Sequence, residues 1–172
     1  NANLYTLNRN TGAATLVGAH GITDLFGLEF DTSTGTLYGT QFVGGSNLYR
    51  LSTGTGAATL VGNVGNGIGI GGLAYDSKRG QLVGVEDGSG QLFNVNRSTA
   101  ALTAIASPGN NNDSGLAYDY DADLFYNYDW SGNFFRIDPS AGYARTRLFT
   151  GTGSHDGLAY VGTTVQPPAV PE

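Results

Sequence analysis

Asp119, Asp121 and Asp123 occupy alternate positions, a spacing that could place three carboxylates around one calcium ion. Calcium binds oxygen ligands, and carboxylates this close together repel one another unless a cation neutralises them. A calcium loop also needs a glycine, where this chain has Leu124, and a terminal glutamate, which is absent. We therefore predict a solvated turn and no cofactor, with calcium at the three aspartates as the alternative.

Two further segments contain the residue types of enzyme sites. Ser154, His155 and Asp156 are the members of a hydrolase triad, but neighbouring residues of an extended chain point to opposite sides. Residues 67–72 match the glycine pattern of dinucleotide sites, which requires a helix directly afterwards, whereas a strand pattern follows here. The chain has no Cys and no Gly-x-Ser-x-Gly motif. We predict that it is not an enzyme.

Aromatic side chains gather in one segment, where Tyr126, Tyr128 and Trp130 alternate along the chain. Tyr and Trp on polar loops can stack against sugars or a partner protein, so these three are candidate ligand-binding residues. Aromatic residues also form cores, and packing between sheets is therefore the alternative.

Candidate glycosylation sites occur in two forms. Asn96 and Asn112 each begin an Asn-x-Ser acceptor sequence. Thr163 and Thr164 lie in a Thr/Pro-rich tail, a composition typical of glycan carriers.

A recurring phrase shows which elements must position these residues. Gly-Leu followed by Ala or Glu and an aromatic residue begins at positions 27, 72, 115 and 157, so the chain repeats every 42 to 45 residues. A fixed period of this length indicates units that complete their cores against neighbours. A second phrase, typified by Asn47-Leu48-Tyr49-Arg50-Leu51, recurs at the same pace.

Each unit consists of short runs in which apolar residues alternate with small or polar ones, separated by Asp- and Gly-rich turns. This pattern predicts four antiparallel strands per unit. Four such units, each of about 43 residues, predict an all-β fold, a β-propeller of four short blades over residues 1–162. Both termini share the closing blade, which is expected to be incomplete. Residues 163–172 are then a Pro-rich tail or an exchanged strand.

In such a ring, the loops that enter the innermost strands meet at one mouth of the axial channel, where ligands usually bind. These loops contain Asp24, Asp113, Asp156, His20 and His155. Glu29 replaces the alanine of the other three copies and is expected to face the channel. A lone buried carboxylate must be paired, protonated or metal-bound, unless it contacts channel water. Asp113, Asp156 and Glu29 are therefore candidate ligand-binding residues.

Charge and composition exclude several partners. The net charge is −6, and Lys78 is the only lysine, so no basic stripe exists to bind nucleic acid or an anionic membrane. No apolar run is long enough to span a membrane. The absence of Met means that the first residue is not an initiator, which favours export after cleavage of a signal peptide.

The repeats that contain Gly72-Leu73-Ala74-Tyr75-Asp76 and Asn47-Leu48-Tyr49-Arg50-Leu51 resemble those of secreted bacterial propeller proteins of unassigned function. The ending Val170-Pro171-Glu172 resembles the start of the Val-Pro-Glu-Pro sorting signal of exported Gram-negative proteins. In that family a membrane helix and a basic cluster follow, and both are missing after Glu172. Together these resemblances imply an extracellular or cell-surface location.

The sequence therefore predicts a non-enzymatic extracellular protein that interacts with copies of itself. An open strand edge, or the tail 163–172, would join copies into a filament or array. The alternative is a lectin-like propeller that binds carbohydrate or metal. A hydrolase or lactonase would need more His and Glu at the channel mouth than the sequence places there.

Overall fold

The computed structural model describes residues 2–42, 46–65, 67–109, 113–153, 157–160 and 162. Fourteen strands and one 3-10 helix are formed in this part of the chain. The strands of the first half are β1 Asn3–Leu7, β2 Ala14–Ala19, β3 Leu25–Asp31, β4 Thr36–Gln41, β5 Asn47–Leu51, β6 Ala58–Asn63 and β7 Ile70–Asp76. Those of the second half are β8 Gln81–Glu86, β9 Leu92–Val95, β10 Leu102–Ala106, β11 Asp113–Asp119, β12 Leu124–Asp129, β13 Asn133–Asp138 and β14 Ala144–Thr150, with the 3-10 helix η1 at Pro139–Ala141.

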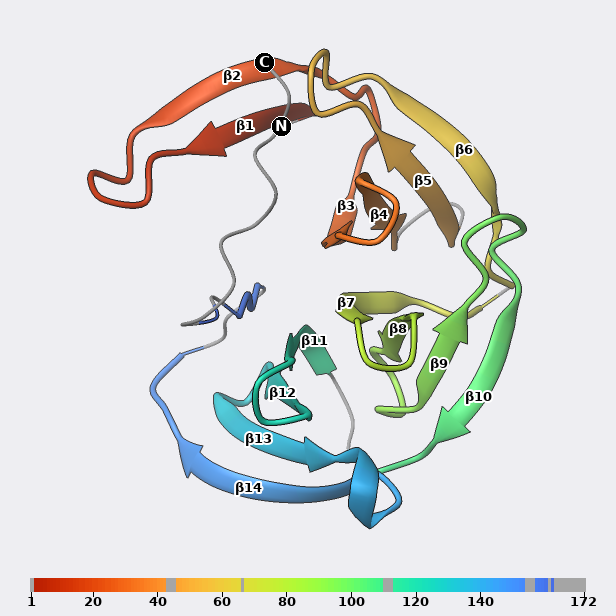
Figure 1. Ribbon diagram of the computed structural model, residues 1–172, viewed down its shortest axis with the longest axis vertical. Helices are drawn as coiled ribbons and strands as arrows, with labels where there is room; N and C mark the ends of the chain where they lie inside the picture. Colours follow the sequence, from red (N-terminus) through yellow and green to blue (C-terminus); the bar gives the residue numbers. More distant parts are fainter. Residues whose placement is uncertain are drawn as a thin grey trace.

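The strands form three four-stranded antiparallel sheets and one two-stranded sheet. Their orders are β3-β4-β5-β6, β7-β8-β9-β10 and β11-β12-β13-β14, followed by the pair β1-β2. The sheets are arranged around a common axis, with β3, β7 and β11 at the centre and β2, β6, β10 and β14 at the rim (Figure 1). This arrangement confirms the predicted all-β propeller of four short antiparallel blades.

Turn chemistry fixes the hairpin between the first two strands of each complete blade. Asp31 accepts a hydrogen bond from the backbone N–H of Ser33, and Asp76 accepts one from that of Lys78. Such contacts hold the chain in a turn. The same hairpins end at Gly35 and Gly80, whose φ angles of +67° and +65° lie in the left-handed region that glycine tolerates. The predicted Asp-to-Gly turns are confirmed.

The core lies between neighbouring blades. Leu73 of β7 packs with Tyr38 and Leu48 of the preceding blade, and all three side chains are buried. Leu116 of β11 packs in the same manner against Val83 of β8. Burying an aliphatic side chain of this size contributes about 1.5–3 kcal/mol relative to exposure. The repeated Leu of β7 and of β11 therefore helps to join each of these sheets to the preceding one.

The fourth blade has only its two outer strands in the described residues, because β1 and β2 form a sheet of their own. Residues 157–160 lie beside the central strand β11 and carry no strand pairing. A Cβ placed at Gly115 would lie 3.2 Å from the Cβ of Leu158. These residues thus stand where the innermost strand of the fourth blade belongs. No helix in the described segments is long and apolar enough to cross a membrane.

Candidate functional site

The third strand of the fourth blade exposes a residue that the other blades bury. Leu7 of β1 has 67% of its surface exposed. At the same position of the repeat, Leu51, Val95 and Ile137 are exposed by only 4%, 1% and 1%. The local sequence is nearly the same in β1 and β5, so the difference arises from the surroundings. In the complete blades, a second strand and its neighbours cover this position.

The neighbouring blade shows the same effect on the opposite side of the gap. Leu28 of β3 is 45% exposed, whereas its repeat counterparts Leu73 and Leu116 are exposed by 2% and 1%. Those two counterparts pack against the preceding blade. Leu28 faces the fourth blade instead, where the inner strands that would cover it are not formed in the described residues.

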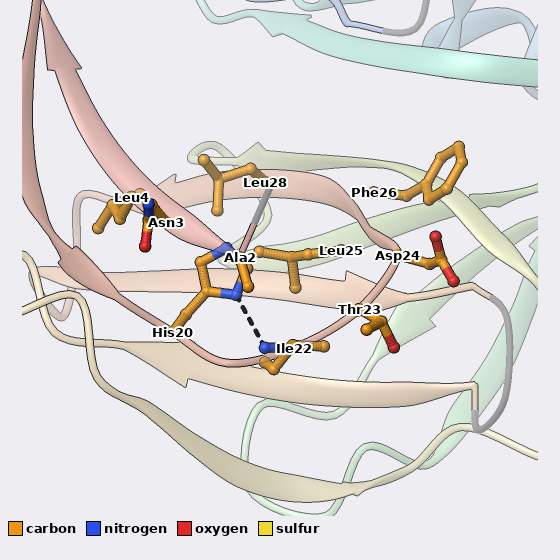
Figure 2. Close-up of a pocket in the computed structure, with 10 residues that line it drawn as sticks. All are labelled: Ala2, Asn3, Leu4, His20, Ile22, Thr23, Asp24, Leu25, Phe26 and Leu28. Atoms are coloured by element: carbon orange, nitrogen blue, oxygen red, sulfur yellow. Dashed lines mark hydrogen bonds between the residues drawn. The ribbon is translucent and has the colours of Figure 1, made fainter.

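Beside Leu28 lies an open hollow of about 480 Å³, which Leu4 of β1 also lines. It extends from the start of β1, past the loop that enters β3, to the first half of β3 (Figure 2). Leu4, Leu25, Phe26 and Leu28 supply its apolar wall. The site is therefore a partly apolar hollow at an incomplete blade, and it could receive apolar side chains.

The polar residues of the cavity come from the loop between β2 and β3. The Nδ1 atom of His20 accepts a hydrogen bond from the backbone N–H of Ile22, at 3.2 Å (Figure 2). Burial lowers the pKa of His20, which keeps the imidazole neutral at pH 7. Asp24 also lines the cavity and adopts a φ of +57°. The predicted mouth residues His20 and Asp24 are thus brought together, beside the gap in the ring.

Glu29 links two blades near the axis, as a carboxylate where the other repeats have alanine. Its Oε1 atom accepts a hydrogen bond from the backbone N–H of Tyr75 in β7, at 3.1 Å. The pKa of Glu29 is raised to about 7, chiefly by burial; the hydrogen bond from Tyr75 opposes the rise, and the nearby carboxylate of Asp31 adds to it. This carboxyl group therefore titrates close to neutral pH.

The wild-type protein is expected to lose stability as pH rises from about 4.5 to about 7, and replacing Glu29 with Gln should abolish this loss. The folded protein holds the proton more tightly than the unfolded chain, so wild-type stability falls as pH rises through this window. Below it, Glu29→Gln and wild type should unfold at similar urea concentrations. At pH 8 the variant should be more stable, by about 1–2 kcal/mol.

Urea unfolding at pH 4.5, 6 and 8 checks this. Other titrating groups, His20 included, are present in both proteins and cancel in the difference. A constant difference across the three pH values would contradict the raised pKa of Glu29.

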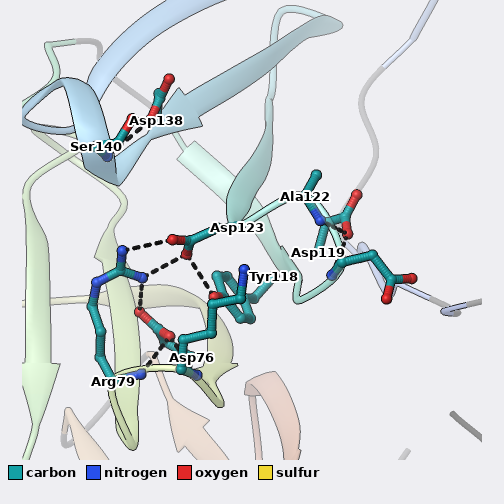
Figure 3. Close-up of polar contacts among 10 residues, drawn as sticks. Asp76, Arg79, Tyr118, Asp119, Ala122, Asp123, Asp138 and Ser140 are labelled. Atoms are coloured by element: carbon teal, nitrogen blue, oxygen red, sulfur yellow. Dashed lines mark hydrogen bonds and ion pairs between the residues drawn. The ribbon is translucent and has the colours of Figure 1, made fainter. Parts of the chain in front are cut away.

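The three aspartates of the predicted calcium loop are engaged with different partners. Asp119 accepts hydrogen bonds from the backbone N–H groups of Asp121 and Ala122 (Figure 3). Asp121 accepts one from the hydroxyl of Tyr160. No group of three acidic, His or Cys side chains in the described residues could hold a metal ion. Calcium binding stays a prediction, without a preformed site in this part of the chain.

Asp123 instead forms an ion pair between two blades. Both of its oxygens bind the guanidinium of Arg79, at 2.7 and 3.0 Å, and Arg79 also binds Asp76 (Figure 3). The hydroxyl of Tyr118 donates to Asp123 at 2.7 Å. The Arg79 guanidinium lowers the pKa of Asp123 to about 2. This cluster fastens the β7–β8 hairpin to the β11–β12 hairpin.

Two of the three candidate aromatic residues pack inside the third blade. Tyr126 stacks on Phe134 of β13, with ring centroids 5.5 Å apart and planes inclined by 6°. Tyr128 is 8% exposed and also contacts Phe134. Trp130, which follows β12, is 47% exposed. Tyr128 is therefore buried, Tyr126 is half-buried against Phe134, and Trp130 is the most exposed of the three.

The remaining candidates are placed only in part. Asn96 lies exposed in the turn after β9, where its side chain accepts backbone hydrogen bonds from Ser98 and Thr99. The backbone of Asp113 belongs to β11. Several predicted residues lie outside the described residues: Asn112, His155, Asp156, Thr163 and Thr164.

Sequence reasoning overlooked the exposed leucines. Leu7 and Leu28 match positions of the repeat that are buried in its other copies, so the sequence pattern of one unit contained no signal for their exposure.

The fold is that of a β-propeller repeat protein, in which the fourth blade has two paired strands within the described residues. No family model matches this sequence, and no curated protein sequence matches it. Solved structures do resemble it. A chain of the nidogen/laminin complex superposes with a TM-score of 0.67 at 21% identity, over 90% of this chain and 60% of that one.

Two bacterial structures are also similar. Virginiamycin B lyase from Staphylococcus aureus gives a TM-score of 0.54 at 14% identity, over 86% of this chain and 48% of the lyase. An auxiliary nutrient binding protein from Bacteroides thetaiotaomicron gives 0.58 at 17% identity, over 78% and 32%. The chain thus spans less than two thirds of each of these chains, and the likeness concerns the fold.

Proposed function

We propose that this chain is a non-enzymatic interaction protein of the cell surface or extracellular space, which joins copies of itself through the incomplete fourth blade. The observation that carries the proposal is the exposure of Leu7 and Leu28. The repeat counterparts of Leu7 are buried in all three four-stranded blades, and those of Leu28 are buried in the other two. Apolar surface that a repeat is built to bury favours association with a partner.

The second edge of β1 would supply the pairing. Within the described residues β1 pairs with β2 alone, and the proposal is that a second chain pairs with its other edge. An exposed strand edge is a template for pairing between molecules. Because the edge and its partner surface differ, copies joined there form a chain or array unless the rotation between them closes a ring.

The similar structures include a binding protein and a lyase, so the fold serves both binding and catalysis elsewhere. The absence of Cys and of a Gly-x-Ser-x-Gly motif supports the non-enzymatic assignment. The lectin-like alternative keeps one exposed aromatic residue, Trp130, since Tyr126 and Tyr128 pack within their blade. We therefore favour interaction between polypeptides.

The test is the size of the protein in solution. Sedimentation velocity and electron microscopy of the purified chain are expected to show species larger than the 17.8 kDa monomer. The Leu7→Asp variant should shift these species to monomer, because a charge in the interface cannot be desolvated cheaply.

Leu60→Asp is the matched control. Leu60 is 57% exposed, but it lies on the outer strand of a complete blade, so the variant should assemble like wild type. A wild-type chain that stays monomeric at every concentration, or a Leu7→Asp variant that still assembles, would refute the proposal.

A further inference from the structure

The third blade, β11-β12-β13-β14, exposes apolar side chains on the face that looks toward the fourth blade. Leu148 and Phe149 of its outer strand β14 are exposed by 47% and 53%. The repeat counterparts of Leu148 are Val61 and Ile105, which are half-buried and pack against the clusters that join their blades to the next one. The outer part of β14 therefore exposes a face that the repeat elsewhere packs against the following blade.

Aromatic side chains continue this face toward the axis. Phe134 of β13 stacks on Phe149, with ring centroids 5.0 Å apart, and on Tyr126 of β12, at 5.5 Å. Phe134 lies opposite Phe149 in the sheet as Leu92 lies opposite Ala106 in the preceding blade. Leu92 is buried between blades, whereas Phe134 is half-buried. We call this surface the third-blade face; it consists of Tyr126, Phe134, Leu148 and Phe149.

Phe149 also replaces a small residue that lets neighbouring blades touch at the rim. Gly18 holds the same repeat position in the fourth blade, and a Cβ at Gly56, in the turn of the next blade, would lie 2.5 Å from its carbonyl oxygen. The counterpart of Gly56 in the β1–β2 turn is Gly12, where a Cβ would meet no atom of the described residues within 4 Å. Within these residues, the third and fourth blades thus lack the rim contact that joins the fourth blade to the next.

Leu7 of β1 belongs to the opposite side of the same junction. Its repeat counterparts Val95 and Ile137 pack against the preceding blade, in clusters with Leu48 and Val83 respectively. For β1 the preceding blade is the third, and β1 and β14 lie on either side of one sector of the ring (Figure 1). Because Leu7 is 67% exposed, the two faces of this junction are not packed together in one molecule.

We propose that the third-blade face of one copy packs against the Leu7 side of the fourth blade of a second copy. The proposal rests on the proposed function and identifies the surface that covers Leu7. The partner is a second copy because both faces continue the junctions that join the other blades of this chain. Aromatic side chains supply a large contact area in an interface. Since the two faces differ and each copy has one of each, the contact is head-to-tail.

Two single variants, first alone and then mixed, test this pairing. Leu7→Asp and Phe149→Asp each place a carboxylate in every contact between identical copies. Each variant alone should therefore associate about tenfold or more weakly than wild type. A mixture restores one contact, between Phe149 of the first variant and Leu7 of the second. Sedimentation velocity of the mixture is expected to show a one-to-one heterodimer that does not grow further.

Leu60→Asp is the control for a charge on an outer strand, because Leu60 is 57% exposed and lies outside both faces. It should assemble as wild type does. Leu148→Asp takes the place of Phe149→Asp if loss of the ring prevents folding, because it alters the same face and leaves the stack of Phe134 on Tyr126 and Phe149 in place. Circular dichroism shows that each variant is folded.

Failure of this proposal is distinguishable from failure of the proposed function. If Phe149→Asp assembles like wild type while Leu7→Asp stays monomeric, self-association stands and the third-blade face is not its partner surface. Dimers of Leu7→Asp alone would mean that third-blade faces pair with each other, which contradicts the head-to-tail contact. A mixture that stays monomeric where wild type assembles also overturns the pairing, and a monomeric wild type refutes the proposed function itself.

Discussion

The Leu51→Ala variant is expected to lose about 2–5 kcal/mol of unfolding free energy, whereas Leu7→Ala should change it by less than about 0.5 kcal/mol. The two leucines occupy the same position of the repeat, but Leu51 is 4% exposed and Leu7 is 67% exposed. Truncating Leu51 removes buried methyl groups and leaves a cavity, while truncating Leu7 removes groups already in contact with water. Urea unfolding of the two variants, compared at low protein concentration, measures the difference.

Leu60→Ala provides an exposed reference, because Leu60 is 57% exposed in a complete blade. Low concentration matters, since association through the fourth blade would cover Leu7. If Leu7→Ala costs as much as Leu51→Ala in the monomer, Leu7 is buried there. That result would mean that the same chain completes its own blade, and it would remove the basis of both proposals.

The architecture could be predicted because each blade repeats the same short sequence motifs. A Gly-Leu phrase with an aromatic residue marks every innermost strand, and Leu73 and Leu116 pack between blades as their alternation predicts. Hairpins that begin with Asp31 or Asp76 and end with glycine form the predicted turns. These features depend on residues near one another in sequence, so the sequence suffices for them.

The contacts of the candidate site residues could not be predicted, because their partners are distant in sequence. Asp123 resembles its neighbours Asp119 and Asp121 locally, but Arg79, from another blade, pairs with it. Tyr128 contacts Phe134 of the next strand, which also contacts Tyr126 and Phe149. Alternation along a strand shows that a side chain faces one side, and the fold alone determines whether that side is covered.

Leu7 and Leu28 show that a residue at a core position of the repeat is not always buried. Each matches a core position, and each is exposed, whereas its repeat counterparts are covered by strands of neighbouring blades. A residue's own sequence motif contains no information on which strands lie beside it.

The Gly18→Ala variant is expected to lose about 3 kcal/mol of stability, with the loss concentrated in the fourth blade. A Cβ at Gly18 of β2 would lie 2.0 Å from the carbonyl oxygen of Thr55, in the β5–β6 turn. The obstacle is backbone, so it cannot turn aside as a side chain would. The turn and β2 must therefore move apart. The same close contact recurs between the next two blades, where a Cβ at Gly62 would lie 2.6 Å from the carbonyl oxygen of Thr99.

Gly54→Ala is the matched control, because a Cβ there meets no atom within 4 Å and its φ is not left-handed. Urea unfolding and hydrogen exchange of both variants test the expectation, with faster exchange predicted across β1 and β2 in Gly18→Ala alone. Within the described residues β1 and β2 form a sheet of their own, so the rim contact at Gly18 is expected to supply much of the packing that holds this sheet to the next blade. Equal stability of Gly18→Ala and Gly54→Ala would show that β2 is held by contacts other than this close approach of backbones.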